Sequence, residues 1–201
     1  REMGDDLPAV ALGSGRTAVA VSAGEFRTCA LLDDASVKCW GGDGLGLGDT
    51  EFRGDEPNEM GDNLPVVNLG SGQAVQVLST GMSHSCVVLA SGQVKCWGLN
   101  DNGELGLGDT DDRGDGPGEM GDDLPAVALG SGRTAVAVMA TDGFSCAILD
   151  DGSLKCWGRN SSGELGLGDT DDRGDGPGEM GDDLPTIDLG TGLVPVAIAG
   201  G

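Results

Sequence analysis

Apolar and polar residues alternate with a period of two in short runs along most of this chain. The pattern is clearest in four runs between residues 64 and 98, which read LPVVNLG (64–70), AVQVLST (74–80), SCVVLA (85–90) and QVKCWG (93–98). A period of two is typical of β-strands with one buried face, and no window carries the 3.6-residue apolar stripe of a helix. Because turn-forming residues separate the runs, the pattern predicts four short strands in this segment and an all-β protein.

The same four-strand pattern recurs along the chain. The motif EMGDxLP begins at Glu2, Glu59, Glu119 and Glu179, which gives repeats of 57, 60 and 60 residues. The first interval is shorter because CWGGDGLGLGDT lacks three residues that CWGLNDNGELGLGDT and CWGRNSSGELGLGDT contain. Repeats of this length, each with four strands, favour the blades of a β-propeller or another closed β-array.

We expect residues 1–201 to form one tandem-repeat domain with three full repeats and partial flanking units. The predicted units are 1–13, the outer strand of a preceding blade; 14–70, 71–130 and 131–190, three blades of four antiparallel strands; and 191–201, the inner strand of a further blade. Three blades and fragments do not close a ring. We therefore expect either a longer chain or copies that associate and cover each other's open strand edges.

The third and fourth of the four runs are predicted to form a hairpin. Pairing Cys86 with Cys96 leaves a three-residue loop that ends in Gly92, a common hairpin connection with glycine in the left-handed position. The third repeat has Gly152 at this place, whereas the first has Ala35. Because an alanine disfavours the left-handed conformation, we expect a more strained turn in the first repeat.

Six cysteines form three pairs with the same spacing, so that each pair lies on opposite strands of one predicted hairpin. The pairs are Cys29 and Cys39, Cys86 and Cys96, and Cys146 and Cys156. Directly opposite positions on antiparallel strands lie within reach of a disulfide. Zinc needs four ligands in one place, and each repeat offers two thiols; buried free thiols are the other alternative. Disulfides persist in oxidising compartments, so we expect a secreted, extracellular or cell-surface protein.

Charge excludes some classes of partner. The formal net charge is −23 at pH 7, with 11 Lys and Arg residues against 34 Asp and Glu residues. Nucleic acids and anionic membrane surfaces are bound mainly through Lys and Arg, so neither is an expected partner. No apolar run approaches the length of about 20 residues that membrane insertion requires.

The sequence offers no candidate catalytic residues, because its carboxylate pairs recur in every repeat whereas an active site is normally unique. We also expect no cofactor-binding residues and no required cofactor. The acidic connector DTDDRGDGPGEM is a candidate Ca²⁺ site with an irregular arrangement of ligands. Its ligands would be Asp109, Asp111, Asp115, Glu119 and Asp122, or Asp169, Asp171, Asp175, Glu179 and Asp182. The competing interpretation is a solvated loop in which Arg113 pairs with a neighbouring Asp. Asn160, in Asn-Ser-Ser, fits a glycosylation acceptor.

The stretch GMSHSCVVLASGQVKCWGLNDNGELGLGD (81–109) resembles the repeat of the regulator of chromosome condensation (RCC) family. The resemblance extends over all three repeats, although Arg27 and Phe144 replace His84 in the first and third. It implies a β-propeller whose four-stranded blades take their outer strand from the LPxVxLG segment. The founding member acts on a small GTPase and binds chromatin. This chain is more similar to secreted, cysteine-containing versions.

These observations predict a non-enzymatic extracellular scaffold for binding or structure, built of disulfide-linked propeller repeats. Its partner would be a protein or an extracellular polymer, and copies would associate into a ring or a filament. The alternative is a regulator that engages a small GTPase, as intracellular members of the family do. In the Arg-Gly-Asp tripeptides we see part of the connector rather than an adhesion signal.

Overall fold

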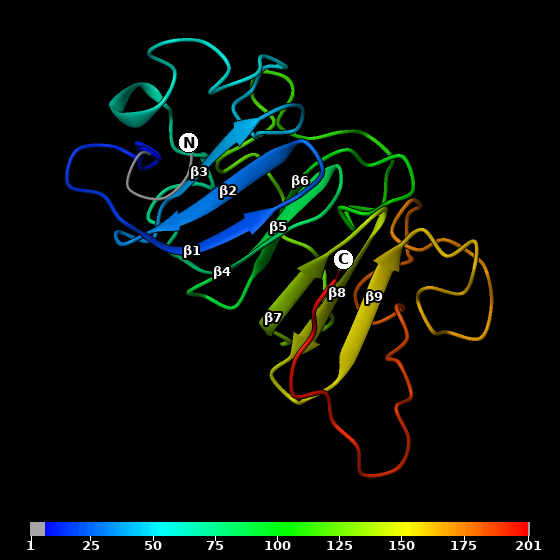
Figure 1. Cartoon of the computed structure of the whole chain (residues 1–201). Helices are drawn as coiled ribbons and strands as arrows, with labels where there is room; N and C mark the ends of the chain where they lie inside the picture. Colours follow the sequence, from blue (N-terminus) through cyan, green and yellow to red (C-terminus); the bar gives the residue numbers. More distant parts are fainter. Residues whose placement is uncertain (1–6, 201) are drawn as a thin grey trace.

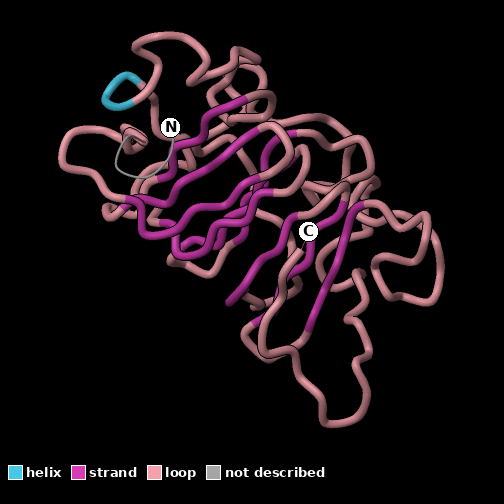
Figure 2. Tube along the Cα trace, in the orientation of Figure 1, coloured by secondary structure: helices cyan, strands magenta, loops and turns pink. Residues whose placement is uncertain are grey.

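The structure is a computed structural model, which describes residues 7–200. It is built almost entirely of strands and loops (Figures 1 and 2). The strands are β1 (Ala18–Ala23), β2 (Arg27–Leu32), β3 (Val37–Gly41), β4 (Val75–Thr80), β5 (His84–Leu89), β6 (Val94–Gly98), β7 (Ala135–Ala140), β8 (Phe144–Leu149) and β9 (Leu154–Gly158), and one short 3₁₀ helix, η2, covers Gly61–Asn63. The all-β prediction is confirmed.

Each repeat contributes one three-stranded antiparallel sheet, in the orders β1-β2-β3, β4-β5-β6 and β7-β8-β9. The sheets follow one another through space as they do along the sequence (Figure 1). The first strand of each sheet faces the sheet before it, since β4 contacts β1 and β2, and β7 contacts β4 and β5. This succession of similar sheets is the arrangement of neighbouring propeller blades.

The predicted hairpin register is confirmed in all three repeats. Cys86 lies opposite Cys96, and the disulfides join Cys29 to Cys39, Cys86 to Cys96, and Cys146 to Cys156, with Cα atoms 4.0 to 4.1 Å apart. Such a short separation is typical of a non-hydrogen-bonded antiparallel pair. The hairpin turn of the first repeat places Ala35 at φ 65°, where Gly92 and Gly152 have φ 79° and 81°, so the expected strain is also present.

The prediction of four strands in each blade is wrong, because each sheet has three. The LPxVxLG segment contributes one backbone hydrogen bond to its sheet, from Val67 N–H to the Val37 carbonyl at 2.8 Å. Proline lacks an N–H, and two carbonyl groups of this segment, which ends the first repeat, bind elsewhere. The carbonyl of Asn68 accepts from Gly121 N–H, and that of Leu69 from Lys95 Nζ.

The hydrophobic core lies between successive sheets. One cluster joins Leu31 and the first disulfide to Val87, Leu89 and Trp97 of the second repeat, and a second cluster joins the second repeat to the third in the same way. Trp97 and Trp157 are fully buried, which agrees with packing as their role. Each repeat therefore depends on its neighbour for most of its apolar burial.

The described residues of both partial units, 7–13 and 191–200, form no strand. Residues 1–6 of the predicted outer strand 1–13 lie outside the described residues, and 7–13 carry no strand. Residues 191–200, predicted as an inner strand, are also irregular, although Ile198 packs against the core of the third repeat. The boundaries of the predicted units stay a prediction.

Candidate functional site

The acidic connector between β6 and the next LPxVxLG segment is the most polar feature of each repeat. In the second repeat it starts at the end of β6, where Gly98 and Arg113 form an isolated antiparallel bridge. Gly98 N–H donates to the Arg113 carbonyl at 2.8 Å, and Arg113 N–H donates back at 3.1 Å. Gly41 pairs with Arg53, and Gly158 with Arg173, in the same way. The arginine of each Arg-Gly-Asp tripeptide is thus fixed to its sheet.

The Arg113 side chain is bound within its own loop. Its Nη2 lies 2.7 Å from Asp109 Oδ2, and its Nη1 donates to the carbonyls of Asp111 and Asp112. The Arg113 side chain is 17% exposed, and Gly114 is buried. The loop therefore holds the tripeptide as part of the connector, as the sequence predicts.

Glu119 closes the same loop from its other end. One carboxylate oxygen, Oε2, accepts from the backbone N–H groups of Gly114 at 2.9 Å and Gly116 at 2.8 Å. Burial would raise the pKa of Glu119, but these two donors lower it. Glu179 accepts from Gly174 and Gly176 in the third repeat. This carboxylate cradle for the glycine N–H groups was not foreseen, although the repeated EM after RGDxPx was a signal for it.

A third set of contacts ties the connector to the preceding repeat. Asp122 accepts from Ser71 N–H at 3.0 Å and Ser71 Oγ at 3.1 Å, and Asp182 binds Ser131 in the same manner. Buried Lys95 donates to the carbonyls of Leu69 and Gly121 at 2.8 and 2.7 Å. Its burial lowers its pKa, while Asp122 opposes the shift. The recurrence of Lys at this position in VKCWG could have pointed to this role.

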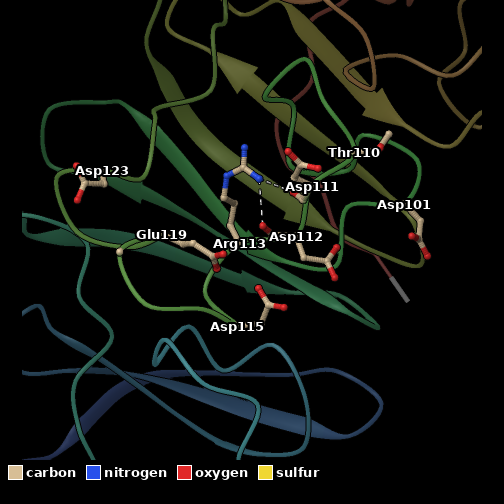
Figure 3. A pocket seen from close by; sticks show the side chains of 9 residues that line it. Asp101, Thr110, Asp111, Asp112, Arg113, Asp115, Glu119 and Asp123 are labelled. Carbon is tan, nitrogen blue, oxygen red and sulfur yellow. Dashed lines mark hydrogen bonds between the residues drawn. The ribbon is translucent and has the colours of Figure 1, made fainter.

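Three of the five carboxylates predicted as calcium ligands in the second repeat line an open depression of about 630 Å³ (Figure 3). Asp111, Asp115 and Glu119 face it, together with Asp101, Asp112, Arg113 and Asp123. Burial raises the pKa values of Asp112 and Asp115, and at Asp115 the proximity of Glu119 adds to the effect.

Protein donors already hold several of the calcium candidates. Asp109 binds Arg113, and Asp122 binds Ser71. In the third repeat Asp169 binds Arg173, and Asp182 binds Ser131. Asp111 and Asp171 accept through their carbonyl groups, and Asp175 lies beside Glu179. Within residues 7–200, no three His, Cys, Asp or Glu side chains come together as a metal-binding group. Calcium binding stays a prediction.

Asn160, the predicted glycosylation acceptor, is buried in the folded chain, and its glycosylation stays a prediction. Its side chain is fully buried, and Nδ2 donates to the carbonyls of Asp169 and Asp171 at 3.1 and 3.0 Å. Asn160 Oδ1 accepts from Leu165 N–H at 2.9 Å, so the amide organises the loop that follows the sheet. Asn100 makes the same contacts in the second repeat.

The only histidine belongs to a buried polar chain between the second and third sheets. His84 Nε2 lies 2.7 Å from Ser145 Oγ, and Ser145 Oγ donates to the Glu104 carbonyl at 2.9 Å. Since that bond uses the hydroxyl proton, Nε2 of His84 must carry the proton shared with Ser145. Desolvation lowers the pKa of His84 to about 3, and the charge of Arg27 acts in the same direction.

Three similar sheets with a disulfide in each, packed in succession around shared apolar clusters, define an all-β repeat protein of the propeller type. A family model described as "Regulator of chromosome condensation (RCC1) repeat" matches residues 18–46, 75–104 and 127–164. The chain belongs to the RCC1-type repeat family. Among described residues, no helix has the length and apolar character to cross a membrane.

Relatives and solved structures agree with this assignment. The ultraviolet-B receptor UVR8 of Arabidopsis thaliana is 33% identical over 161 residues, which cover 78% of this chain and 33% of the receptor. The structure of yeast RCC1 (Prp20) bound to Kap60 matches with a TM-score of 0.65 and 21% identity, over 92% of this chain and 38% of that one. A structure of Prp20p from Saccharomyces cerevisiae gives a TM-score of 0.63 at 20% identity, over 92% and 40%. The chain thus spans about a third of the receptor's length.

Proposed function

We propose that this chain is a non-enzymatic scaffold of disulfide-linked RCC1-type repeats that binds other macromolecules outside the cell or at its surface. The observation that carries the proposal is that all six cysteines are paired in buried disulfides, one in each repeat. The cytosol keeps thiols reduced, whereas oxidising compartments preserve such bonds. The paired cysteines therefore favour placing this chain with the secreted, cysteine-containing versions of the repeat.

The compartment is tested by counting thiols on protein isolated from its own cells. The protein is denatured without a reductant, treated with an alkylating reagent and weighed by mass spectrometry. We expect no alkylated cysteine before reduction and six after it. Six alkylated cysteines before reduction would overturn the extracellular assignment and favour the intracellular alternative.

A protein is the partner that the family favours. The solved structure of yeast RCC1 contains Kap60, and the report on Prp20p concerns its binding to Gsp1p and histones. For this chain we propose a protein with a basic surface, because a formal net charge of −23 attracts such a surface over long range. Association should then slow as salt rises, and an association rate independent of salt would contradict the proposal.

The alternative function is regulation of a small GTPase, which family membership supports. A nucleotide-exchange assay with a fluorescent guanine nucleotide and small GTPases from the source cells distinguishes a scaffold from a GTPase regulator. We expect the exchange rate to stay at its uncatalysed value when the chain is added. A saturable acceleration would replace the scaffold proposal with the regulatory one.

We further propose that the scaffold extends by contact with another repeat of the same kind. Val21 on β1 is 61% exposed, whereas its counterpart Val138 on β7 is covered by the preceding repeat and is 5% exposed. A repeat of a longer chain or of a second copy fits this face. Light scattering at rising concentration should show association of this chain, and Val21→Lys should weaken it. A monomer at all concentrations would refute association between copies.

A further inference from the structure

The junction between the first and second repeats differs from the junction that follows it. In the second repeat the carbonyl of Glu104 accepts hydrogen bonds from Ser145 Oγ at 2.9 Å and from Trp157 Nε1 at 3.0 Å. The three-residue deletion shortens the equivalent loop of the first repeat. Among described residues, the corresponding buried nitrogen, Trp97 Nε1, has no acceptor.

Arg27 occupies part of the space left by the deletion. It stands where the second repeat has His84, and it is 4% exposed. Its Nη1 donates to the carbonyls of Asp43 at 2.7 Å and Gly44 at 3.2 Å. Its Nε and Nη2 have no acceptor within residues 7–200. The same junction therefore holds three buried N–H-bearing nitrogens without an acceptor, which is costly for a folded protein.

The Arg27 side chain stays charged at neutral pH. Burial lowers its pKa to about 10, while the nearby Asp43 carboxylate opposes that shift. A desolvated guanidinium whose Nε and Nη2 are both free presents two parallel donors, the geometry that matches the two oxygens of a carboxylate. Buried charged groups with shifted pKa values in a cleft are a feature of functional sites.

A cleft of about 340 Å³ opens at this junction. Arg27, Asp43, Gly44, Met82, Asp112 and Asp115 are among its lining residues. The following junction is closed at the equivalent place, because the loop glycine Gly103 packs against the backbone of Gly174 and Asp175. The cleft is thus the space that the deleted residues would fill.

A second substitution accompanies the deletion. In the second repeat Asp112 accepts a hydrogen bond from Asn100 N–H at 2.8 Å, and Asp172 accepts one from Asn160 at 2.7 Å in the third. The first repeat lacks the asparagine and carries Phe52, 52% exposed, in place of the aspartate. Loss of both members of the pair, with Arg27 in place of histidine, indicates a remodelled site rather than a damaged repeat.

We propose that this junction is a binding site for a carboxylate group, held by Nε and Nη2 of Arg27, whose side chain lines the cleft. Both nitrogens are closed to solvent, so the ligand reaches them when the Asp43–Gly44 turn, which binds Nη1 of the same guanidinium, moves aside. The carboxylates of Asp43, Asp112 and Asp115 repel a doubly charged phosphate more strongly than a singly charged carboxylate. The site goes beyond the scaffold function and does not depend on it.

The chain contains its own control for a test by NMR. The indole N–H of Trp97 lacks an acceptor, whereas that of Trp157 is bonded to Glu104. Because Trp97 packs at the first junction and Trp157 at the next, titration with acetate up to about 100 mM should shift the Trp97 indole signal in a saturable way and leave Trp157 unmoved. A Trp97 signal that does not move, or that moves together with Trp157, overturns the proposal.

Variants identify the group that binds. Arg27→Gln should weaken acetate binding by about tenfold or more, because it removes a charge-assisted pair. Arg16→Gln is the matched control, since Arg16 pairs with exposed Asp33 and Asp34, and should bind acetate as the unchanged chain does. Equal binding by Arg27→Gln and the unchanged chain overturns the proposal.

A loop insertion and two further probes complete the test. Giving the first repeat the longer loop of the second repeat should fill the cleft and abolish binding, even if Arg27→Gln fails to fold; retained binding would contradict the assignment. A capped Gly-Asp-Gly peptide that binds more tightly than acetate supports a protein side chain as the source, and weaker binding supports a free acid. Inorganic phosphate that binds more tightly than both would overturn the choice of a carboxylate.

Discussion

One contribution to the acid sensitivity of this protein should come from His84. The imidazole is 1% exposed and neutral, with its Nε2 proton shared with Ser145. Desolvation lowers its pKa to about 3 from the ordinary value of 6.5, so the unfolded chain binds a proton at a pH where the folded chain does not. A folded pKa below the unfolded one stabilises fully above the unfolded pKa, and this stabilisation is lost as pH falls from 6.5 towards 3.

The size of the effect follows from the two pKa values. Each pH unit below the unfolded pKa changes the free energy of unfolding by about 1.4 kcal/mol, until the folded pKa is reached. At about pH 5 the difference amounts to about 2 kcal/mol. This is a large fraction of the total for a domain whose stability is normally about 5 to 15 kcal/mol.

Urea unfolding followed by tryptophan fluorescence at about pH 8 and pH 5 measures this difference, provided that the disulfides stay intact. His84→Phe is the matched control, since the third repeat carries Phe144 at the same position. The unchanged chain should lose about 2 kcal/mol more than the variant between the two pH values. Equal losses would show that His84 is not held neutral by burial, and the inferred proton position would fall with it.

Three further changes test the fold. Replacing Cys86 and Cys96 together by Ser should lower the free energy of unfolding by about 2.5 kcal/mol, measured by urea denaturation without reductant. Ala35→Gly should raise it by about 0.5 kcal/mol, because Ala35 has φ 65°, while Ala90→Gly in the second repeat should bring no gain; a loss at Ala35 would argue against strain. Asn160→Ala should lower the melting temperature through a loss of about 3 kcal/mol, and an unchanged melting temperature would contradict its organising role.

Local patterns were sufficient to predict the sheets. The period of two, the three-residue loops and the spacing of Cys86 and Cys96 all concern residues that are close in sequence and pair within one hairpin. Register follows from such short-range constraints, because a shift by one residue would move every apolar side chain to the wrong face. The packing of Trp97 between repeats was likewise predictable from its place next to the disulfide.

The LPxVxLG segment shows where prediction from local pattern fails. Its alternation is that of a strand, and its apolar side chains are buried, as Leu64, Val67 and Leu69 are. Whether a strand forms depends on where the backbone groups bind, and two of those partners, Lys95 and Gly121, come from the next repeat. The burial of Asn160 could not be predicted for the same reason, because the carbonyl groups that bind its side chain belong to a connector about ten residues away.

The deletion in the first repeat changes how the repeats should be interpreted. Loops that recur in more than one repeat are explained by packing alone, as the carboxylate cradle of Glu119 and the buried amide of Asn100 are. Binding specificity needs a place where one repeat differs from the others. That place is the first junction, where Arg27 and Trp97 retain buried donors without an acceptor, whereas at the second junction a loop carbonyl binds Trp157. The repeated contacts therefore stabilise the fold of this chain, and the proposed binding site lies at the junction where the first repeat differs from the others.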